Sequence, residues 1–111
     1  SKITESQMKI ILNQYSKTLI NSARDIEYAL FAENILQDRE ESLLIAFKEA
    51  KAAEELTIDQ YNRGVSTIFE LLDAQSRRLS AESLLINSSL LRITNRIKLH
   101  LAISSPLFEE I

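Results

Sequence analysis

The residue types that most often carry chemistry are scarce in this sequence of 111 residues. His100 is the only histidine, and there is no cysteine. A metal centre or an acid–base pair needs several converging side chains, and a lone histidine does not supply them. No nucleophile constellation and no glycine-rich phosphate loop is visible either. We therefore expect no enzymatic activity, no metal and no cofactor.

Charged side chains gather on both sides of the only glycine, Gly64. On the residues alone, Glu70 belongs to a helix cap. Asp73 is then a carboxylate near a helix N-terminus, where the helix dipole stabilises it by about 0.3–1 kcal/mol. Arg77 and Arg78 could pair with nearby aspartates or with a neighbouring protomer, and a solvated pair of arginines is the simpler interpretation.

The elements that position these residues follow from the near absence of turn formers. One glycine and one proline leave little material for the turns of a sheet. Gly64 can take the left-handed conformation that ends a helix, and it divides two stretches with helical periodicity. The sequence predicts an all-α fold, a long antiparallel α-helical hairpin forming a single domain. Its parts are a helix at 4–63, a tip at 64–66, a helix at 67–104 and a tail at 105–111.

The first helix opens with a potential capping box, Thr4-x-x-Gln7. Its apolar residues recur at steps of three and four in two registers. A polar stretch at 37–41 separates the registers and predicts either a solvated turn of helix or a kink. The first register comprises Met8, Leu12, Tyr15, Leu19, Ala23, Ile26 and Leu30, and the second comprises Ala46, Ala50, Ala53 and Ile58 beside Leu43 and Phe47.

The second helix opens with a clear capping box, Thr67-x-x-Glu70. It is expected to end before Pro106, which cannot continue the hydrogen-bond ladder. A near-heptad apolar stripe runs along this helix and predicts coiled-coil packing. The apolar stripe comprises Ile68, Leu72, Leu79, Ile86, Leu90, Ile93, Ile97 and Leu101, with Gln75 and Glu82 at its two polar steps.

The two predicted helices differ in length, at roughly 90 Å and roughly 55 Å. The second helix therefore covers the first only to about residue 25, and Met8, Leu12, Tyr15 and Leu19 are left without a partner in the chain. A bare two-helix hairpin also buries little core. We expect other helices to cover the rest, from further copies of the chain or from a parent protein of which it is an excised segment.

Composition limits the classes of function. Hydrophobic residues make up 45% of the chain, which argues against disorder. The net charge is −3 with both signs interspersed, so there is no electrostatic case for binding nucleic acid. The longest apolar runs, such as 43–47, fall far short of the roughly 20 residues that span a bilayer. No signal peptide is visible.

The most distinctive sequence surrounds the glycine, where residues 61–75 read YNRGVSTIFELLDAQ. This segment resembles the outer-membrane efflux protein family, the TolC/OprM-like channels, whose members carry Y-x-x-G-x-x-(S/T)-x-x-(D/E)-(V/L)-L-D-A-(Q/T) near the C-terminus. The similarity extends over about residues 20–104. The resemblance does not identify a subfamily, because LAISSP at 101–106 stands where family members often have a glycine-rich tail. The nine agreeing positions are Tyr61, Gly64, Thr67, Glu70, Leu71, Leu72, Asp73, Ala74 and Gln75.

The resemblance implies the periplasmic α-barrel segment of a trimeric outer-membrane efflux or secretion channel. Such a channel conducts exported substrates passively, and the hairpin tip docks a periplasmic membrane-fusion adaptor protein. An inner-membrane transporter supplies the energy. The implied location is the periplasmic portion of an outer-membrane protein. The implied assembly is a trimer in the parent channel and a self-associated bundle for this segment.

The resemblance also assigns residues at the tip. Tyr61 would belong to a network that holds the tip closed, and Asp73 to an acidic ring that narrows the pore. On the residues alone, Arg63 offsets the negative end of the first helix, Ser66 is an ordinary turn residue, and Tyr61 seals the end of the hairpin. The implied docking surface comprises Arg63, Gly64, Val65 and Ser66, and the implied pore entrance comprises Tyr61, Glu70 and Asp73.

A rival interpretation belongs to a different class, a cytoplasmic interaction or signalling module that forms a homodimeric four-helix bundle. An amphipathic helix at a membrane surface fits less well, because the polar faces carry no excess of Lys and Arg. The parent gene separates the two main interpretations. Two hairpin repeats flanked by alternating strands, after a signal peptide, would belong to the channel.

Overall fold

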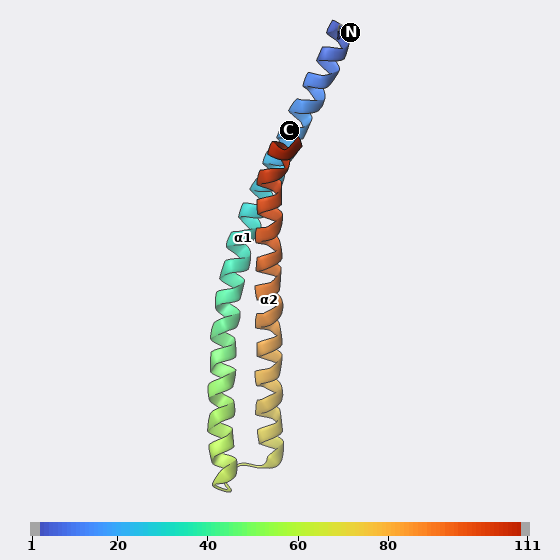
Figure 1. Ribbon diagram of the computed structural model, residues 1–111. Coiled ribbons are helices and arrows are strands. Elements are labelled where there is room, and N and C mark those ends of the chain that lie inside the picture. The colour runs from blue at the N-terminus through green and yellow to red at the C-terminus, as the bar shows by residue number, and fades with distance from the viewer. Residues whose placement is uncertain (1–2, 110–111) are drawn as a thin grey trace. The chain divides into compact units, whose positions relative to one another are not determined.

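Two helices account for most of the chain in the computed structural model, which describes residues 3–109 and the side chains of residues 3–104. They are α1, Glu5–Asn62, and α2, Ile68–Glu109 (Figure 1). No strand occurs in the described range. The helices run antiparallel, because α1 residues further from the turn contact later residues of α2: Glu54 pairs with Arg78, and Glu40 with Arg92. The predicted all-α antiparallel hairpin is confirmed.

Each helix begins with the capping box that its sequence predicts. At α1, the Gln7 N–H donates to Thr4 Oγ1 at 3.2 Å, and the Thr4 N–H donates to Gln7 Oε1 at 3.0 Å. At α2, the Glu70 N–H donates to Thr67 Oγ1 at 3.2 Å, and the Thr67 N–H donates to Glu70 Oε2 at 3.4 Å. These bonds give partners to backbone donors that the helix itself leaves unsatisfied.

The α2 helix ends later than predicted. The sequence predicted an end at 104 and a tail from 105, whereas the backbone stays helical to Glu109. A proline removes one bond from the helical ladder, here to the carbonyl of residue 102. The helix nevertheless continues through Pro106, so this loss does not end it. The α1 helix likewise runs without a break through 37–41, where a kink was one of the two expectations.

The hairpin consists of two compact units. Unit 2 comprises Asn34–Ile93 and contains the turn, and unit 1 comprises the flanking parts of both helices. In unit 1, Asn95 Nδ2 donates to the Ala29 carbonyl at 2.9 Å, and Arg96 Nε lies 3.1 Å from Glu33 Oε1. Polar side chains from α2 thus reach across to α1 within this unit.

In unit 2, the face of α2 that packs on α1 repeats every seven residues and mixes leucine, arginine and small side chains. Ser88, only 2% exposed, is the most buried residue of this face. The packing face of α2 comprises Leu71, Ala74, Arg78, Ala81, Leu85, Ser88 and Arg92. The packing face of α1 comprises Glu40, Leu43, Phe47, Ala50, Glu54 and Thr57, whereas Ala46, Ala53 and Ile58 of the predicted second register are exposed.

The apolar stripe predicted along α2 is not its packing face. Leu72, Leu79, Ile86 and Ile93 are 53%, 53%, 51% and 54% exposed. Each follows a residue of the packing face directly, so it is turned by about 100° around the helix. These four side chains therefore lie on a flank of unit 2 beside the packing face, where they stay about half exposed.

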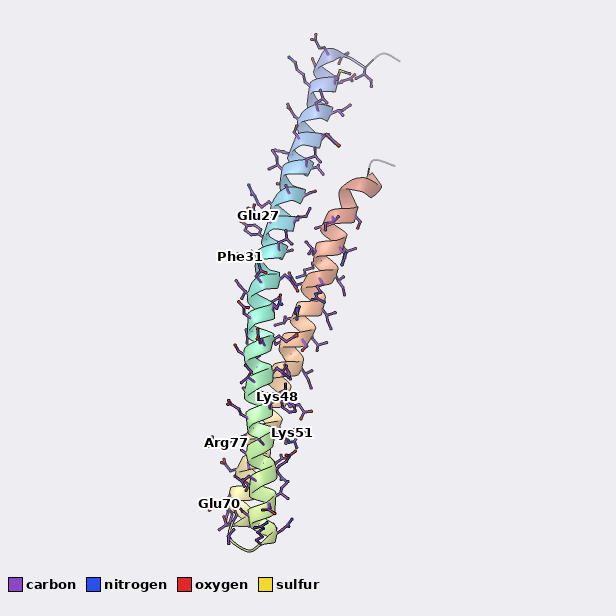
Figure 2. All side chains as sticks on the ribbon, turned by 90° about the vertical axis from the view of Figure 1, so that its left-hand side faces the viewer. Glu27, Phe31, Lys48, Lys51, Glu70 and Arg77 are labelled. Atoms are coloured by element: carbon purple, nitrogen blue, oxygen red, sulfur yellow. The ribbon has the colours of Figure 1, made fainter. Side chains whose placement is uncertain are left out.

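Little apolar surface is buried within the described chain. Ala29 and Ala74 are its only buried hydrophobic residues. Near the N-terminus of α1, Met8, Leu12 and Leu19 are 57%, 57% and 43% exposed, as the unequal helix lengths predict. Figure 2 shows side chains projecting outward along both helices. The described chain thus presents extended apolar faces and has almost no core.

Candidate functional site

The hairpin tip begins at Gly64, whose φ of +79° lies in the left-handed region. The Gly64 N–H donates to the Tyr61 carbonyl at 3.0 Å, and the Val65 N–H donates to the Gln60 carbonyl at 2.9 Å. This pair of bonds is the Schellman motif with glycine at the C′ position. The predicted helix stop at Gly64 is confirmed, and no other described residue has a positive φ.

The surroundings of Gly64 are open. A Cβ atom built on this residue would meet no other atom within 4 Å, so the glycine is required for its backbone conformation and not for space within the chain. Arg63 pairs with Asp59 at 3.2 Å, and both side chains lie on the surface. Tyr61, in the last turn of α1, is 41% exposed. The tip is therefore accessible from outside the chain.

Two apolar side chains project from the tip. Val65 is 74% exposed and Phe69 is 79% exposed, the two highest values among the large hydrophobic residues of the described chain. Phe69 was not among the predicted site residues. It lies two residues before Leu71 and so points away from the face that packs on α1, but the sequence alone did not show which face packs. Both residues lie within the segment that surrounds the turn.

Glu70 holds the tip together. Its Oε2 accepts hydrogen bonds from Ser66 Oγ and from the Thr67 N–H, while its own N–H bonds to Thr67. The capping role predicted for Glu70 is confirmed. Ser66 is half-buried and bonded to this carboxylate, so it stiffens the turn and is not fully displayed on the surface.

A groove of about 620 Å³ lies beside the tip in unit 2. Alanines from both helices line it, and Asp73 lies on its rim. Asp73 Oδ2 is 2.9 Å from Arg77 Nε, with both side chains mostly exposed, so Asp73 has one of the partners that the sequence suggested. Figure 2 shows Glu70 and Arg77 on α2 in the part nearest the turn. The lining includes Ala46, Ala50, Ala53, Ala74, Glu49 and Glu70.

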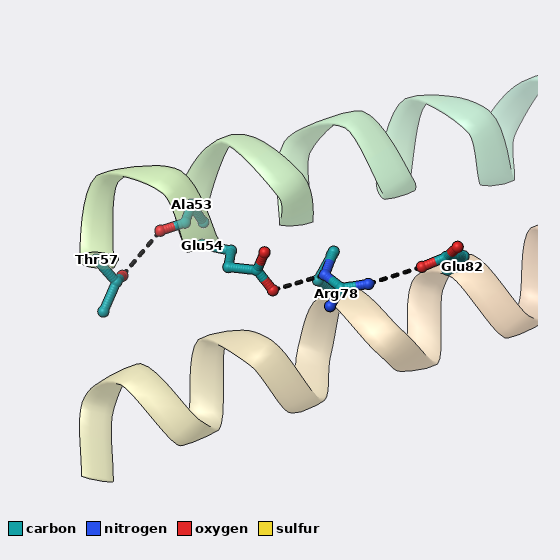
Figure 3. A network of polar contacts seen from close by, with 5 residues as sticks. All are labelled: Ala53, Glu54, Thr57, Arg78 and Glu82. Carbon is teal, nitrogen blue, oxygen red and sulfur yellow. Dashed lines mark hydrogen bonds and ion pairs between the residues drawn. The ribbon is translucent and has the colours of Figure 1, made fainter. Parts of the chain in front are cut away.

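Arg78 is not the solvated arginine that the sequence suggested. Its Nε is 2.6 Å from Glu54 Oε2 and its Nη1 is 2.7 Å from Glu82 Oε2 (Figure 3), and its side chain is only 26% exposed. The hydrogen bond to Glu54 raises the pKa of the Arg78 guanidinium above its ordinary value. Desolvation opposes the rise, and the charges of Glu54 and Glu82 add to it. Like any arginine, Arg78 is a permanent cation. It lies seven residues from both Leu71 and Leu85, on the packing face of α2.

Reactive groups do not converge in the part of the chain that the structure describes. His100 is exposed on α2, and no three His, Cys, Asp or Glu residues in that part could hold a metal ion. Among the described residues, no helix is long and apolar enough to cross a bilayer.

No known protein family matches this chain, and neither does any curated protein or any solved structure. The resemblance to outer-membrane efflux channels therefore depends on the sequence of residues 61–75 and on the position of that segment at the hairpin turn.

Proposed function

We propose that this chain is a periplasmic hairpin of a trimeric outer-membrane efflux or secretion channel, and that its tip docks a periplasmic adaptor protein. The observation that carries the proposal is the tip itself. The segment that resembles the family forms the hydrogen-bonded turn of the hairpin and the start of α2, and its Val65 and Phe69 are the most exposed large hydrophobic residues of the described chain. Open space at Gly64 gives helices of an adaptor close access to the backbone.

The flanks of the hairpin support a place in a helical barrel. The apolar stripe of α2 is about half exposed, and helices of neighbouring hairpins would cover it. The chain supplies a wall and a docking tip, while an inner-membrane transporter supplies the energy for export. Conduction of exported substrates in this scheme is passive and needs no catalytic group.

Asp73 is proposed to line the pore entrance together with Tyr61 and Glu70. Three symmetry-related carboxylates near an axis attract cations. The ion pair of Asp73 with Arg77 offsets part of this charge, and the hydrogen bonds of Glu70 to the turn limit the movement of the Glu70 side chain.

We expect Asp73→Asn to reduce cation selectivity in single-channel recordings of the full-length channel. Unchanged conductance and selectivity would remove Asp73 from the pore lining.

Docking is tested in the full-length channel by placing a charge on the projecting side chains. Val65→Asp and Phe69→Asp should abolish cross-linking to the adaptor and should impair export, because each buries a carboxylate in an apolar contact. Ser80→Asp adds the same charge at an exposed position of α2 away from the tip and should leave both readouts unchanged. Tip variants that assemble as trimers and still capture the adaptor would refute the docking role.

The exposed apolar stripe of α2 also suits a second function, a homodimeric four-helix-bundle interaction or signalling module. In such a module the stripe packs against its copy, and the tip needs no partner. The complete reading frame separates the two. A signal peptide and two hairpin repeats between alternating strands would support the channel, and a cytoplasmic chain without strands would support the module.

A further inference from the structure

Two ion pairs join the helices of unit 2 at equivalent levels of a seven-residue repeat. Glu54 lies 2.6 Å from Arg78, and Glu40 lies 3.0 Å from Arg92. The four side chains are between 13% and 27% exposed, so these pairs are largely shielded from solvent. The two glutamates are two heptads apart on α1, and the two arginines are two heptads apart on α2.

Apolar residues occupy the same faces at the intervening levels. Midway between the two pairs, Phe47 of α1 and Leu85 of α2 share a level, and both are half-buried. Tyr61 and Leu71 share the corresponding level nearest the turn. The helices of unit 2 thus meet through alternating apolar and ionic layers.

A slip of one heptad would destroy this match. In one direction, Arg78 comes level with Phe47 while Glu40 comes level with Leu85. In the other direction, Arg92 comes level with Phe47. Each slipped arrangement leaves shielded charges opposite apolar side chains, and this is unfavourable because their desolvation is no longer compensated.

We propose that the two interhelical ion pairs select the register of the hairpin against slips of one heptad. The turn favours the same register, but unwinding a helical turn beside residues 63–67 would accommodate a slip, since a longer loop adds little closure entropy. Polar groups at core positions of coiled coils are known to specify register at some cost in stability. This inference concerns the fold and does not depend on the proposed transport function.

The register can be measured by intramolecular cross-linking, because the chain contains no cysteine. Ala50 comes within one residue of the level of Ala81 in the observed register, of Ala74 after a slip in one direction, and of Ser88 after a slip in the other. Three versions of the full 111-residue chain carry Ala50→Cys together with Ala81→Cys, Ala74→Cys or Ser88→Cys. A short bifunctional thiol reagent, applied at a concentration at which circular dichroism shows the chain to be helical, then reports each register as an intramolecular product.

We expect the observed-register pair to react at least about tenfold faster than either slipped pair in the otherwise unchanged chain. Replacement of both ionic layers, by Glu40→Leu, Glu54→Leu, Arg78→Leu and Arg92→Leu, should reduce this preference to about threefold or less, with the melting temperature unchanged or raised. A preference lost without loss of stability is the signature of register selection.

A charge-swapped chain is the matched control, and its ionic layers remain complementary, so the preference should persist. Its substitutions are Glu40→Arg, Glu54→Arg, Glu82→Arg, Arg78→Glu and Arg92→Glu.

If the leucine chain aggregates, glutamine at Glu40, Glu54, Arg78 and Arg92 removes the charges while keeping the layers polar. A full preference retained by the soluble leucine chain or by the glutamine chain would show that the turn alone sets the register and would overturn the proposal.

Discussion

At the scale of single residues, the conformation of Gly64 decides how cleanly α1 ends. Gly64→Val should destabilise the chain by about 1–2 kcal/mol, because a β-branched residue is strained at positive φ. The space around Gly64 is open, so the loss comes from the backbone and not from a clash. Urea unfolding followed by circular dichroism measures it.

Gly64→Asn is the control for this prediction. Asparagine tolerates the left-handed region better than other residues with a side chain, so it should lose clearly less stability than valine. Equal stability of the valine and asparagine variants would show that the +79° conformation of Gly64 is not required.

The adjacent residues Arg77 and Arg78 should respond differently to the same substitution. Arg77→Met removes an exposed ion pair within one helix and should cost no more than about 0.5 kcal/mol. Arg78→Met should lower the unfolding midpoint clearly further, because it leaves Glu54, 13% exposed, without this partner. Thermal melts of the two variants make the comparison, and equal losses would contradict the buried role of Arg78.

At the scale of elements, the start of α2 depends on one hydroxyl. Thr67→Ala removes the side-chain half of the capping box and should destabilise the chain by about 0.5–2 kcal/mol. Thr18→Ala is the matched control, since Thr18 lies inside α1 and bonds only back to the Gln14 carbonyl. That change should be neutral or slightly stabilising. Equal effects on the unfolding free energy would exclude the cap as the cause.

At the scale of the whole molecule, the scarcity of core predicts self-association. Ala29 and Ala74 are the only buried hydrophobic residues of the described chain, and so little burial rarely sustains an isolated fold. We expect sedimentation to show concentration-dependent assembly and helicity to fall on dilution. A monodisperse monomer that stays fully helical at low concentration would contradict this expectation.

The surface that drives association can be identified by substitution. Leu79→Glu combined with Ile86→Glu places charges on the apolar stripe of α2 and should raise the association midpoint at least about tenfold in concentration. Ser80→Glu combined with Asn87→Glu adds the same charge at exposed polar positions away from the stripe and should have little effect. A similar shift in both variants would point to net charge as the cause.

Features that depend on bonds between neighbouring residues could be predicted from the amino-acid order. The helix stop at Gly64 and the capping boxes at Thr4 and Thr67 follow from bonds that span only a few residues. Three of the tip's predicted residues, Arg63, Gly64 and Val65, are exposed in the structure. Phe69 escaped the prediction because its neighbours reveal its helical state but not its exposure.

Which faces of the two helices meet became apparent only in the folded chain. The apolar stripe of α2 and its packing face both repeat at nearly seven residues, so periodicity within α2 cannot choose between them. The packing face carries Arg78 and Arg92, whose partners Glu54 and Glu40 lie 24 and 52 residues away in the sequence. A charged residue can enter a packing face when a distant partner neutralises it, and that partner becomes apparent only once the chain has folded back on itself.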